Sequence, residues 1–173
     1  MLVDAINRNN ENPRDPRNRE VVHMGNDPFD ANLATPINAS GLTMAYINNL
    51  PAYRAGITPF RRGLEVGMAH GYWLIGPFAK LGPLRDTDIA NLAGLLSTIG
   101  LLIISTLCLS LYGASNPPAP TKTITTPRPP EELKTSEGWN EYGSGFLIGG
   151  IGGAAFAYFL LANLPVLKEL LNL

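Results

Sequence analysis

The chain has 173 residues, a formal net charge of −1 and 45% hydrophobic residues, averages that resemble those of an ordinary soluble domain. The small net charge creates no strong electrostatic field, which argues against nucleic acid as a partner. The charges are unevenly placed, however, because Asp, Glu, Lys and Arg are absent from 89–121 and from 142–167. A helix in a globular core is rarely free of charge on every face. The sequence therefore predicts a membrane protein.

Residues 1–57 are polar and rich in Asn, Pro and Arg, with weak periodicity and frequent turn residues. A segment with so few large apolar residues has difficulty in building its own core. We therefore predict an extended, irregular arm outside the membrane, either disordered when isolated or ordered by a partner. His23 in this arm is expected to be a surface side chain rather than a ligand.

A first membrane helix is predicted over 59–80. Thr58 is a good N-cap, and Pro59 suits the first helical position because its missing N–H would be unpaired there. Arg61 and Arg62 follow at the entrance of the helix, where long cationic side chains can reach lipid headgroups.

Two ionisable side chains lie well inside this apolar helix, Glu65 and His70. Charged groups are costly in lipid, so such side chains need partners. Their spacing places them about 140° apart around the helix and about 7.5 Å apart along it, so a shared metal is not expected. Glu65 can pair with Arg61 or Arg62, or bind a ligand. His70 is either a neutral imidazole bonded to a Ser or carbonyl, or an axial ligand.

Gly63, Gly67 and Gly71 recur every four residues and form a small-residue face that lets a backbone or a flat ligand approach closely. Gly67 lies one turn before His70, and helical side chains lean toward that turn. We therefore expect space for a planar macrocycle at Gly67. A ring with a five-coordinate metal, such as the Mg²⁺ of chlorophyll, needs a single axial donor of this kind.

The loop at 81–88 contains Arg85 and Asp86. We expect Asp86 to be solvated or paired with Arg85. Binding of a hard cation by this carboxylate is the alternative.

A second membrane helix is predicted over 88–112, with Thr87 or Asp88 as its N-cap. It would measure about 36 Å, enough to cross a bilayer with some tilt. The lone cysteine, Cys108, excludes an intramolecular disulfide and is expected to be a small packing residue.

Residues 114–136 form a connector rich in Pro and Thr, which favours an extended, stiff path. A third membrane helix is predicted over 137–163, with Ser136 as its N-cap. Small residues repeat along it at four-residue spacing and form a second face for tight helix contact: Gly145, Gly149, Gly153 and Ala157.

The predicted fold is therefore an all-α membrane protein, with a three-helix transmembrane domain over 58–173 and the arm over 1–57 on one side of the membrane. Orientation follows from Lys and Arg, which favour the cytoplasmic side. The arm and connector share a side and carry Arg54, Arg61, Arg62, Lys122, Arg128 and Lys134, whereas the opposite side carries Lys80, Arg85 and Lys168. We predict a cytoplasmic N-terminus and a C-terminus on the other side.

Three stretches are long and specific: INNLPAYRAGITPFRRGLEVGMAHGYWLIGPFAKLGPLRD, NLAGLL and GFLIGGIGGAAFAYF. Through them the chain closely resembles the subunit XI (PsaL) family of photosystem I, of cyanobacterial type, over most of its length. The resemblance implies a non-catalytic, three-helix subunit of the thylakoid membrane that binds chlorophyll a and β-carotene, with a stromal N-terminus and a lumenal C-terminus. The implied partners are the photosystem I core and small membrane subunits, lipid, and PsaL copies of neighbouring monomers in a trimer or tetramer.

The resemblance also implies site residues. Glu65 and His70 match the glutamate and histidine that are axial ligands of chlorophyll magnesium in the family. The loop motif GPLRD matches the chain at residues 82–86. In trimers of the family its Asp and Pro help to bind Ca²⁺, which implies Asp86 and Pro83 here. No catalytic residue is implied.

An alternative interpretation is a small transporter or channel subunit that uses Glu65 and His70 as an ion relay. It predicts a colourless protein whose transport depends on pH. A membrane enzyme is the weakest interpretation, because no nucleophile–base set or metal cluster is visible.

Overall fold

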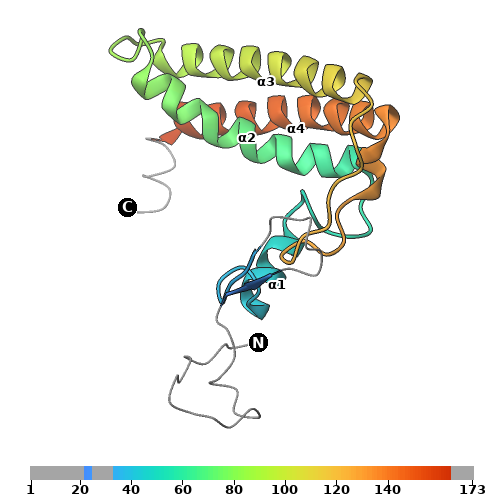
Figure 1. Ribbon diagram of the computed structural model, residues 1–173. Helices are drawn as coiled ribbons and strands as arrows, with labels where there is room; N and C mark the ends of the chain where they lie inside the picture. Colours follow the sequence, from blue (N-terminus) through green and yellow to red (C-terminus); the bar gives the residue numbers. More distant parts are fainter. Residues whose placement is uncertain (1–21, 25–32, 165–173) are drawn as a thin grey trace, which may run out of the picture. The chain divides into compact units, whose positions relative to one another are not determined.

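The structure, a computed structural model, describes residues 22–24 and 33–164 of the chain. Its elements are β1 (His23–Met24), β2 (Leu33–Ala34), α1 (Gly41–Asn49), α2 (Pro59–Leu81), α3 (Ala90–Ala114), the 3₁₀ helix η2 (Glu131–Lys134) and α4 (Ser136–Ala162) (Figure 1). The predictions for the His23 side chain, for Lys168 and for most of the first 32 residues fall outside the described part.

The described residues form two compact units, and the first contains 22–24, 33–55 and Pro120–Pro130. Here β1 pairs with β2 in antiparallel register. Ser40 caps α1 by accepting a hydrogen bond from the Thr43 N–H at 3.1 Å. Thr125 joins 120–130 to this unit, since its carbonyl accepts from Asn48 Nδ2 at 2.7 Å.

The helix α1 corrects the prediction of an irregular arm over 1–57. None of the nine residues of α1 is buried, so no apolar face marked the helix in the sequence. It is held instead by its Ser40 cap and by hydrogen bonds from side chains to the backbone, such as Asn48 Nδ2 to the Met44 carbonyl at 2.7 Å.

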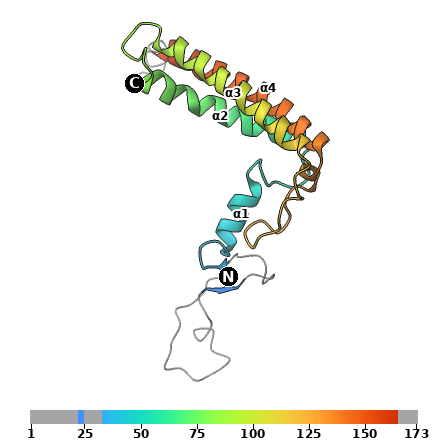
Figure 2. The same ribbon diagram turned by 45° about the horizontal axis from the view of Figure 1, so that its top comes forward.

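Of the described residues, the second unit contains Gly56–Ala119 and 131–164, and its long helices α2, α3 and α4 all pack against one another (Figure 1, Figure 2). They lie close to the predicted ranges 59–80, 88–112 and 137–163. In the described part, α3 and α4 are the two helices long and apolar enough to cross a membrane. The helix α2 has a lower mean hydropathy because it contains five ionisable side chains: Arg61, Arg62, Glu65, His70 and Lys80.

The α2–α4 contact is the most extensive in the bundle, and it is made by glycines on both sides. A methyl group added to any glycine of the small-residue face of α2 would collide with the α4 backbone. At Gly63 it would meet Tyr142, at Gly67 it would meet Phe146, and at Gly71 it would meet Gly150. The α4 stripe meets the α2 backbone in the same way, with Gly145 at Phe60, Gly149 at Leu64 and Gly153 at Met68. The prediction that both small-residue faces serve tight helix contact is confirmed, and the two faces are partners of each other.

The N-caps of α2 and α4 show one confirmed and one corrected prediction. Thr58 caps α2, and its hydroxyl accepts from the Arg61 N–H at 3.2 Å. Thr135, rather than Ser136, caps α4 and accepts from the Gly138 N–H at 3.0 Å. Helix starts of this kind differ by one residue when two adjacent hydroxyl residues compete for the cap.

The start of α3 also differs from the prediction, since neither Thr87 nor Asp88 is its cap. Ile89 occupies the N-cap and makes no side-chain cap bond. The Thr87 hydroxyl is engaged elsewhere, because it donates to the Leu84 carbonyl at 2.7 Å. Sequence alone does not separate these uses of a threonine, which can serve a turn as well as a cap.

The connector 114–136 was predicted to be extended and stiff, but it contains the 3₁₀ helix η2 at its end. Leu133 of η2 is 8% exposed, and its carbonyl accepts a hydrogen bond from Trp139 Nε1 at 2.6 Å. Trp139 also lies against Gly113, where an added methyl carbon would be 2.5 Å from the Trp139 Cβ. The indole thus fixes the connector to the ends of α3 and α4.

Candidate functional site

His70 of α2 is exposed on the surface of the bundle, with a fixed ring orientation. Its Nδ1 lies 2.8 Å from the Val66 carbonyl. A carbonyl oxygen can only accept, so Nδ1 carries a proton, and in the neutral ring the lone pair is on Nε2, on the far side of the ring from this bond. The ring also meets Phe146 of α4 edge-on, with centroids 5.4 Å apart. A neutral imidazole whose other nitrogen donates to a carbonyl is the usual form of a metal-binding histidine.

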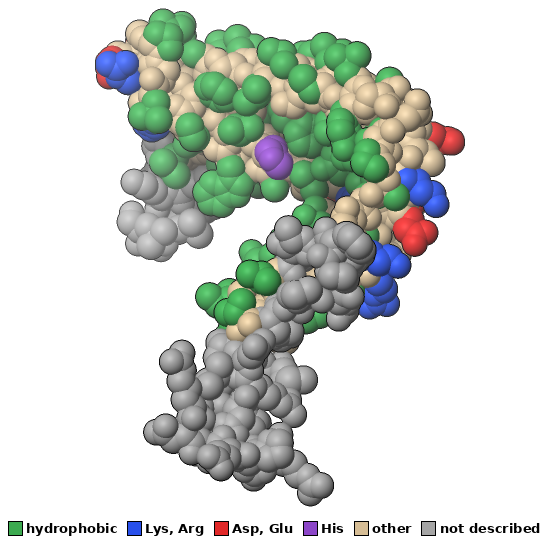
Figure 3. Space-filling model, viewed as in Figure 1, with side chains coloured by type: hydrophobic (Ala, Val, Ile, Leu, Met, Phe, Trp, Pro, Cys, Tyr) green, Lys and Arg blue, Asp and Glu red, His purple; other side chains and the backbone are tan. Residues whose placement is uncertain are grey.

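His70 lines an open groove of 690 Å³. Side chains from α3 and α4 complete its walls, among them Leu101, Ile104, Ser105, Cys108, Tyr142 and Phe146. The space-filling view shows a largely hydrophobic surface around the histidine on the bundle (Figure 3). Apolar walls with a few convergent polar groups are typical of a small-molecule site.

Cys108 differs from its prediction as a small packing residue. It is exposed on α3 and lines the same groove as His70. Cys108 has apolar neighbours before and after it in the sequence, so the pattern does not indicate which face of α3 packs against the other helices.

The structure corrects the expectation of free space at Gly67. The missing side chain at Gly67 faces the backbone of Phe146, so α4 fills the position that was expected to receive a planar ring. The open groove lies instead on the face of α2 that carries Val66 and His70, which are one turn apart. The space beside the imidazole is therefore formed by three helices and not by one glycine.

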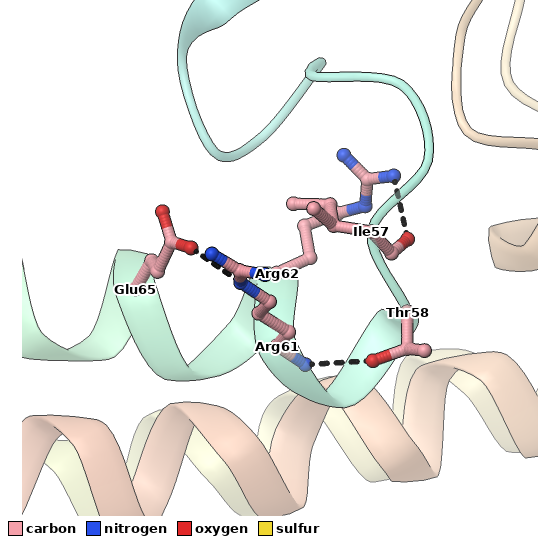
Figure 4. A network of polar contacts seen from close by, with 5 residues as sticks. All are labelled: Ile57, Thr58, Arg61, Arg62 and Glu65. Carbon is pink, nitrogen blue, oxygen red and sulfur yellow. Dashed lines mark hydrogen bonds and ion pairs between the residues drawn. The ribbon is translucent and has the colours of Figure 1, made fainter.

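Glu65 pairs with Arg61, one of the alternatives that the spacing predicted. Arg61 Nε and Glu65 Oε1 are 3.0 Å apart, and the side chains are 64% and 26% exposed (Figure 4). Such a pair contributes only about 0–1 kcal/mol where water reaches it. It reduces the cost of placing the carboxylate among apolar side chains.

Arg62 corrects a prediction, since it does not extend outward beside Arg61. It is 2% exposed, and its Nη2 donates to the Ile57 carbonyl at 3.5 Å (Figure 4). Adjacent helix positions point about 100° apart, so only one of two consecutive arginines can face the partner helix. The glycine stripe that begins at Gly63 was the available signal, because it fixes which side of α2 faces α4.

Asp86 lies in the loop between α2 and α3 with its side chain 84% exposed. Its Oδ2 is 3.4 Å from Arg85 Nε, which is the ion pair that the sequence predicted as one alternative. Among the described residues no three His, Cys, Asp or Glu side chains are grouped to hold a metal ion. Ca²⁺ takes about six to eight oxygen ligands, so Asp86 and Pro83 do not complete a calcium site within one chain.

These features define a class: a helical protein with apolar helices of membrane length and a histidine side chain that lines an apolar groove. The family model described as photosystem I reaction centre subunit XI (PsaL) matches residues 20–166. The chain therefore belongs to the photosystem I reaction centre subunit XI family, and the resemblance stated from the sequence is confirmed.

Individual relatives carry the same name. The photosystem I reaction center subunit XI of Mastigocladus laminosus is 61% identical over 98% of this chain and 98% of its own length. That of a Nostoc species is 60% identical over 99% of this chain and 100% of its own. That of a Picosynechococcus species is 60% identical over 86% of this chain and 97% of its own.

Proposed function

We propose that this chain is a non-catalytic subunit of photosystem I in the thylakoid membrane, where it binds chlorophyll a and β-carotene. The observation that carries the proposal is the imidazole of His70, whose Nδ1 is hydrogen-bonded to the Val66 carbonyl and which lines an apolar groove. These residues fit a planar ring with a central magnesium ion, which absorbs light and passes on excitation when bound. Membership of the family does not favour the ion relay.

The residues of this chain would hold such a ring in one orientation. The Val66 carbonyl and the edge of Phe146 set the plane of the imidazole, and the imidazole sets the axis along which a metal can bind. The apolar walls of the groove would lie against the faces of the ring.

Replacement of His70 by leucine tests this proposal. We expect His70→Leu to remove one chlorophyll per assembled complex, because leucine fills a similar volume and has no lone pair. Pigment extraction from purified photosystem I, normalised to the amount of this subunit on an immunoblot, measures the loss. Tyr72→Phe on the same helix is the control and should keep every pigment. An unchanged chlorophyll count in His70→Leu would contradict ligation.

Glu65 is proposed as a second axial ligand, and its pairing with Arg61 makes the test a comparison of three variants. Glu65→Leu removes the oxygen donors and the ion pair together, Glu65→Gln keeps a carbonyl donor, and Arg61→Gln removes the ion pair alone. We expect a chlorophyll to be lost in Glu65→Leu and retained in the other two. If Glu65 serves only the ion pair, Glu65→Leu and Arg61→Gln will have the same pigment content.

The proposed arrangement in the membrane has three spanning helices in a domain over 58–173 and the arm 1–57 on the stromal side, with a lumenal C-terminus. Support for α2 as a span comes from its packing against both α3 and α4 and from its 23 residues, about 34 Å at the standard rise. Its polar side chains have partners within the same helix, because Glu65 forms an ion pair with Arg61 and His70 is hydrogen-bonded to the Val66 carbonyl.

The proposed partners are the photosystem I core, its small membrane subunits, lipid, and copies of this subunit in neighbouring monomers of a trimer or tetramer. Large apolar side chains are exposed along α3 and suit contact with lipid or protein: Leu92, Leu96, Ile103, Ile104, Leu107 and Leu111. Calcium at Asp86 and Pro83 stays a proposal that requires oxygen ligands from another copy or from water.

A further inference from the structure

Ser105 of α3 lines the same groove as His70, and its hydroxyl forms no hydrogen bond within the described part of the chain. The threonines of the same helix behave differently. Thr98 Oγ1 donates to the Gly94 carbonyl and Thr106 Oγ1 to the Leu102 carbonyl, both at 2.8 Å. Hydroxyl side chains inside helices usually satisfy themselves in this way. Ser97, Ser105 and Ser110 of α3 make no such bond within the described residues, and of these three Ser105 is the one that lines the groove.

Ser105 and His70 lie at nearly the same depth along the bundle. The antiparallel helices α2 and α3 meet where a methyl group on Gly94 would be 2.8 Å from the Ala79 Cβ (Figure 1). From this contact His70 is about 13.5 Å away along α2, and Ser105 is about 16.5 Å away along α3. A single ligand that is held by His70 can therefore reach the Ser105 hydroxyl across the groove.

A hydrogen bond from the Ser105 hydroxyl to a bound ligand would be energetically favourable. An unsatisfied polar group among apolar side chains is costly, and more so where no water is at hand. In an apolar pocket, a few such groups determine the orientation and identity of the ligand. The Cys108 thiol, one turn further along α3, lines the groove as well but is only a weak donor.

We propose that Ser105 is a specificity-determining residue of the groove, which donates a hydrogen bond from its hydroxyl to a carbonyl group of the ring that His70 binds. This inference rests on the proposed function, because the ring is present only if His70 holds it. The ligand class is a metal-centred planar ring with a peripheral carbonyl in conjugation. A hydrogen bond to that carbonyl weakens its double bond, lowers its stretching frequency and favours one orientation of the ring about the metal–nitrogen axis.

Resonance Raman spectra of purified photosystem I test this inference. The difference between unmodified complexes and His70→Leu complexes isolates the carbonyl bands of the His70-bound ring. We expect Ser105→Ala to leave the pigment count unchanged and to move one of those bands to higher wavenumber. Two matched controls should leave the band in place: Thr106→Val, which removes a hydroxyl that is bonded to its own helix, and Cys108→Ala, which changes the groove wall without removing a strong donor.

The outcomes separate the inference from the function. The inference is supported if the band moves in Ser105→Ala but in neither control variant, and if Ser105→Ala causes no shift in complexes that also carry His70→Leu. Unmoved bands in Ser105→Ala, together with pigment loss in His70→Leu, overturn the role of Ser105 and leave the proposed function intact. An equal shift in Cys108→Ala also overturns it, because groove shape would then be the cause. Full pigment content in His70→Leu overturns both proposals.

Discussion

Gly67→Ala is expected to destabilise the bundle by about 1–3 kcal/mol, the usual cost of forcing extra volume into a packed contact. The added methyl group would collide with the carbonyl oxygen of Phe146. A backbone atom inside a helix cannot rotate away as the end of a side chain can. The two helices must therefore separate, which loosens the neighbouring glycine contacts as well. Gly149→Ala, which meets the Leu64 carbonyl from the other helix, should have a similar effect.

Glycines elsewhere in the same helices provide matched controls. Within the described residues, a methyl group at Gly100 of α3 or Gly152 of α4 meets nothing within 4 Å. Alanine is the better helix former by about 1 kcal/mol, so these two substitutions should be neutral or stabilising. The midpoint of thermal dissociation of the subunit from solubilised complexes measures the effect. Equal midpoints for Gly149→Ala and Gly152→Ala, which are three residues apart on α4, would show that the close helix contact is absent.

The long helices could be predicted from the sequence because their signals are local. Charge-free stretches and caps such as Thr58 mark a helix without reference to the rest of the chain. The glycine repeats likewise predicted close contact. What the repeats did not specify was the partner, because any smooth helix face can pair with any other. The short helix α1 was missed since none of its residues is buried and its amino-acid pattern is therefore not periodic.

The candidate site was predictable only in part. His70 was identified from its position, since an imidazole in an apolar helix needs a partner. Its surroundings depend on the rotation of α2 about its own axis relative to α4. This rotation directs Gly67 against the backbone of Phe146 and leaves the groove on the face of α2 that carries Val66 and His70. Ser105 and Cys108 join the groove from a helix that is distant in sequence, so no spacing rule connects them to His70.

Arg62 and Arg61 are neighbours in sequence, and their substitution should have clearly different effects. Arg62→Ala is expected to cost about 1.5–3 kcal/mol, because it removes a charged hydrogen bond to the Ile57 carbonyl and the packing of a 2%-exposed side chain. Arg61→Ala should cost less than about 1 kcal/mol, since it removes only a surface pair with Glu65.

The cost at Arg62 has a structural consequence at the entrance to α2. Ile57 directly precedes the Thr58 cap, so a guanidinium bonded to the Ile57 carbonyl holds the chain in the path that begins the helix. Arg62→Lys keeps the charge but loses the planar fork of donors, and it should fall between alanine and the native residue. The same thermal dissociation assay distinguishes the three variants. If Arg62→Ala and Arg61→Ala dissociate at the same temperature, the buried arginine does not stabilise the helix start, and the rotation of α2 is set by its glycines alone.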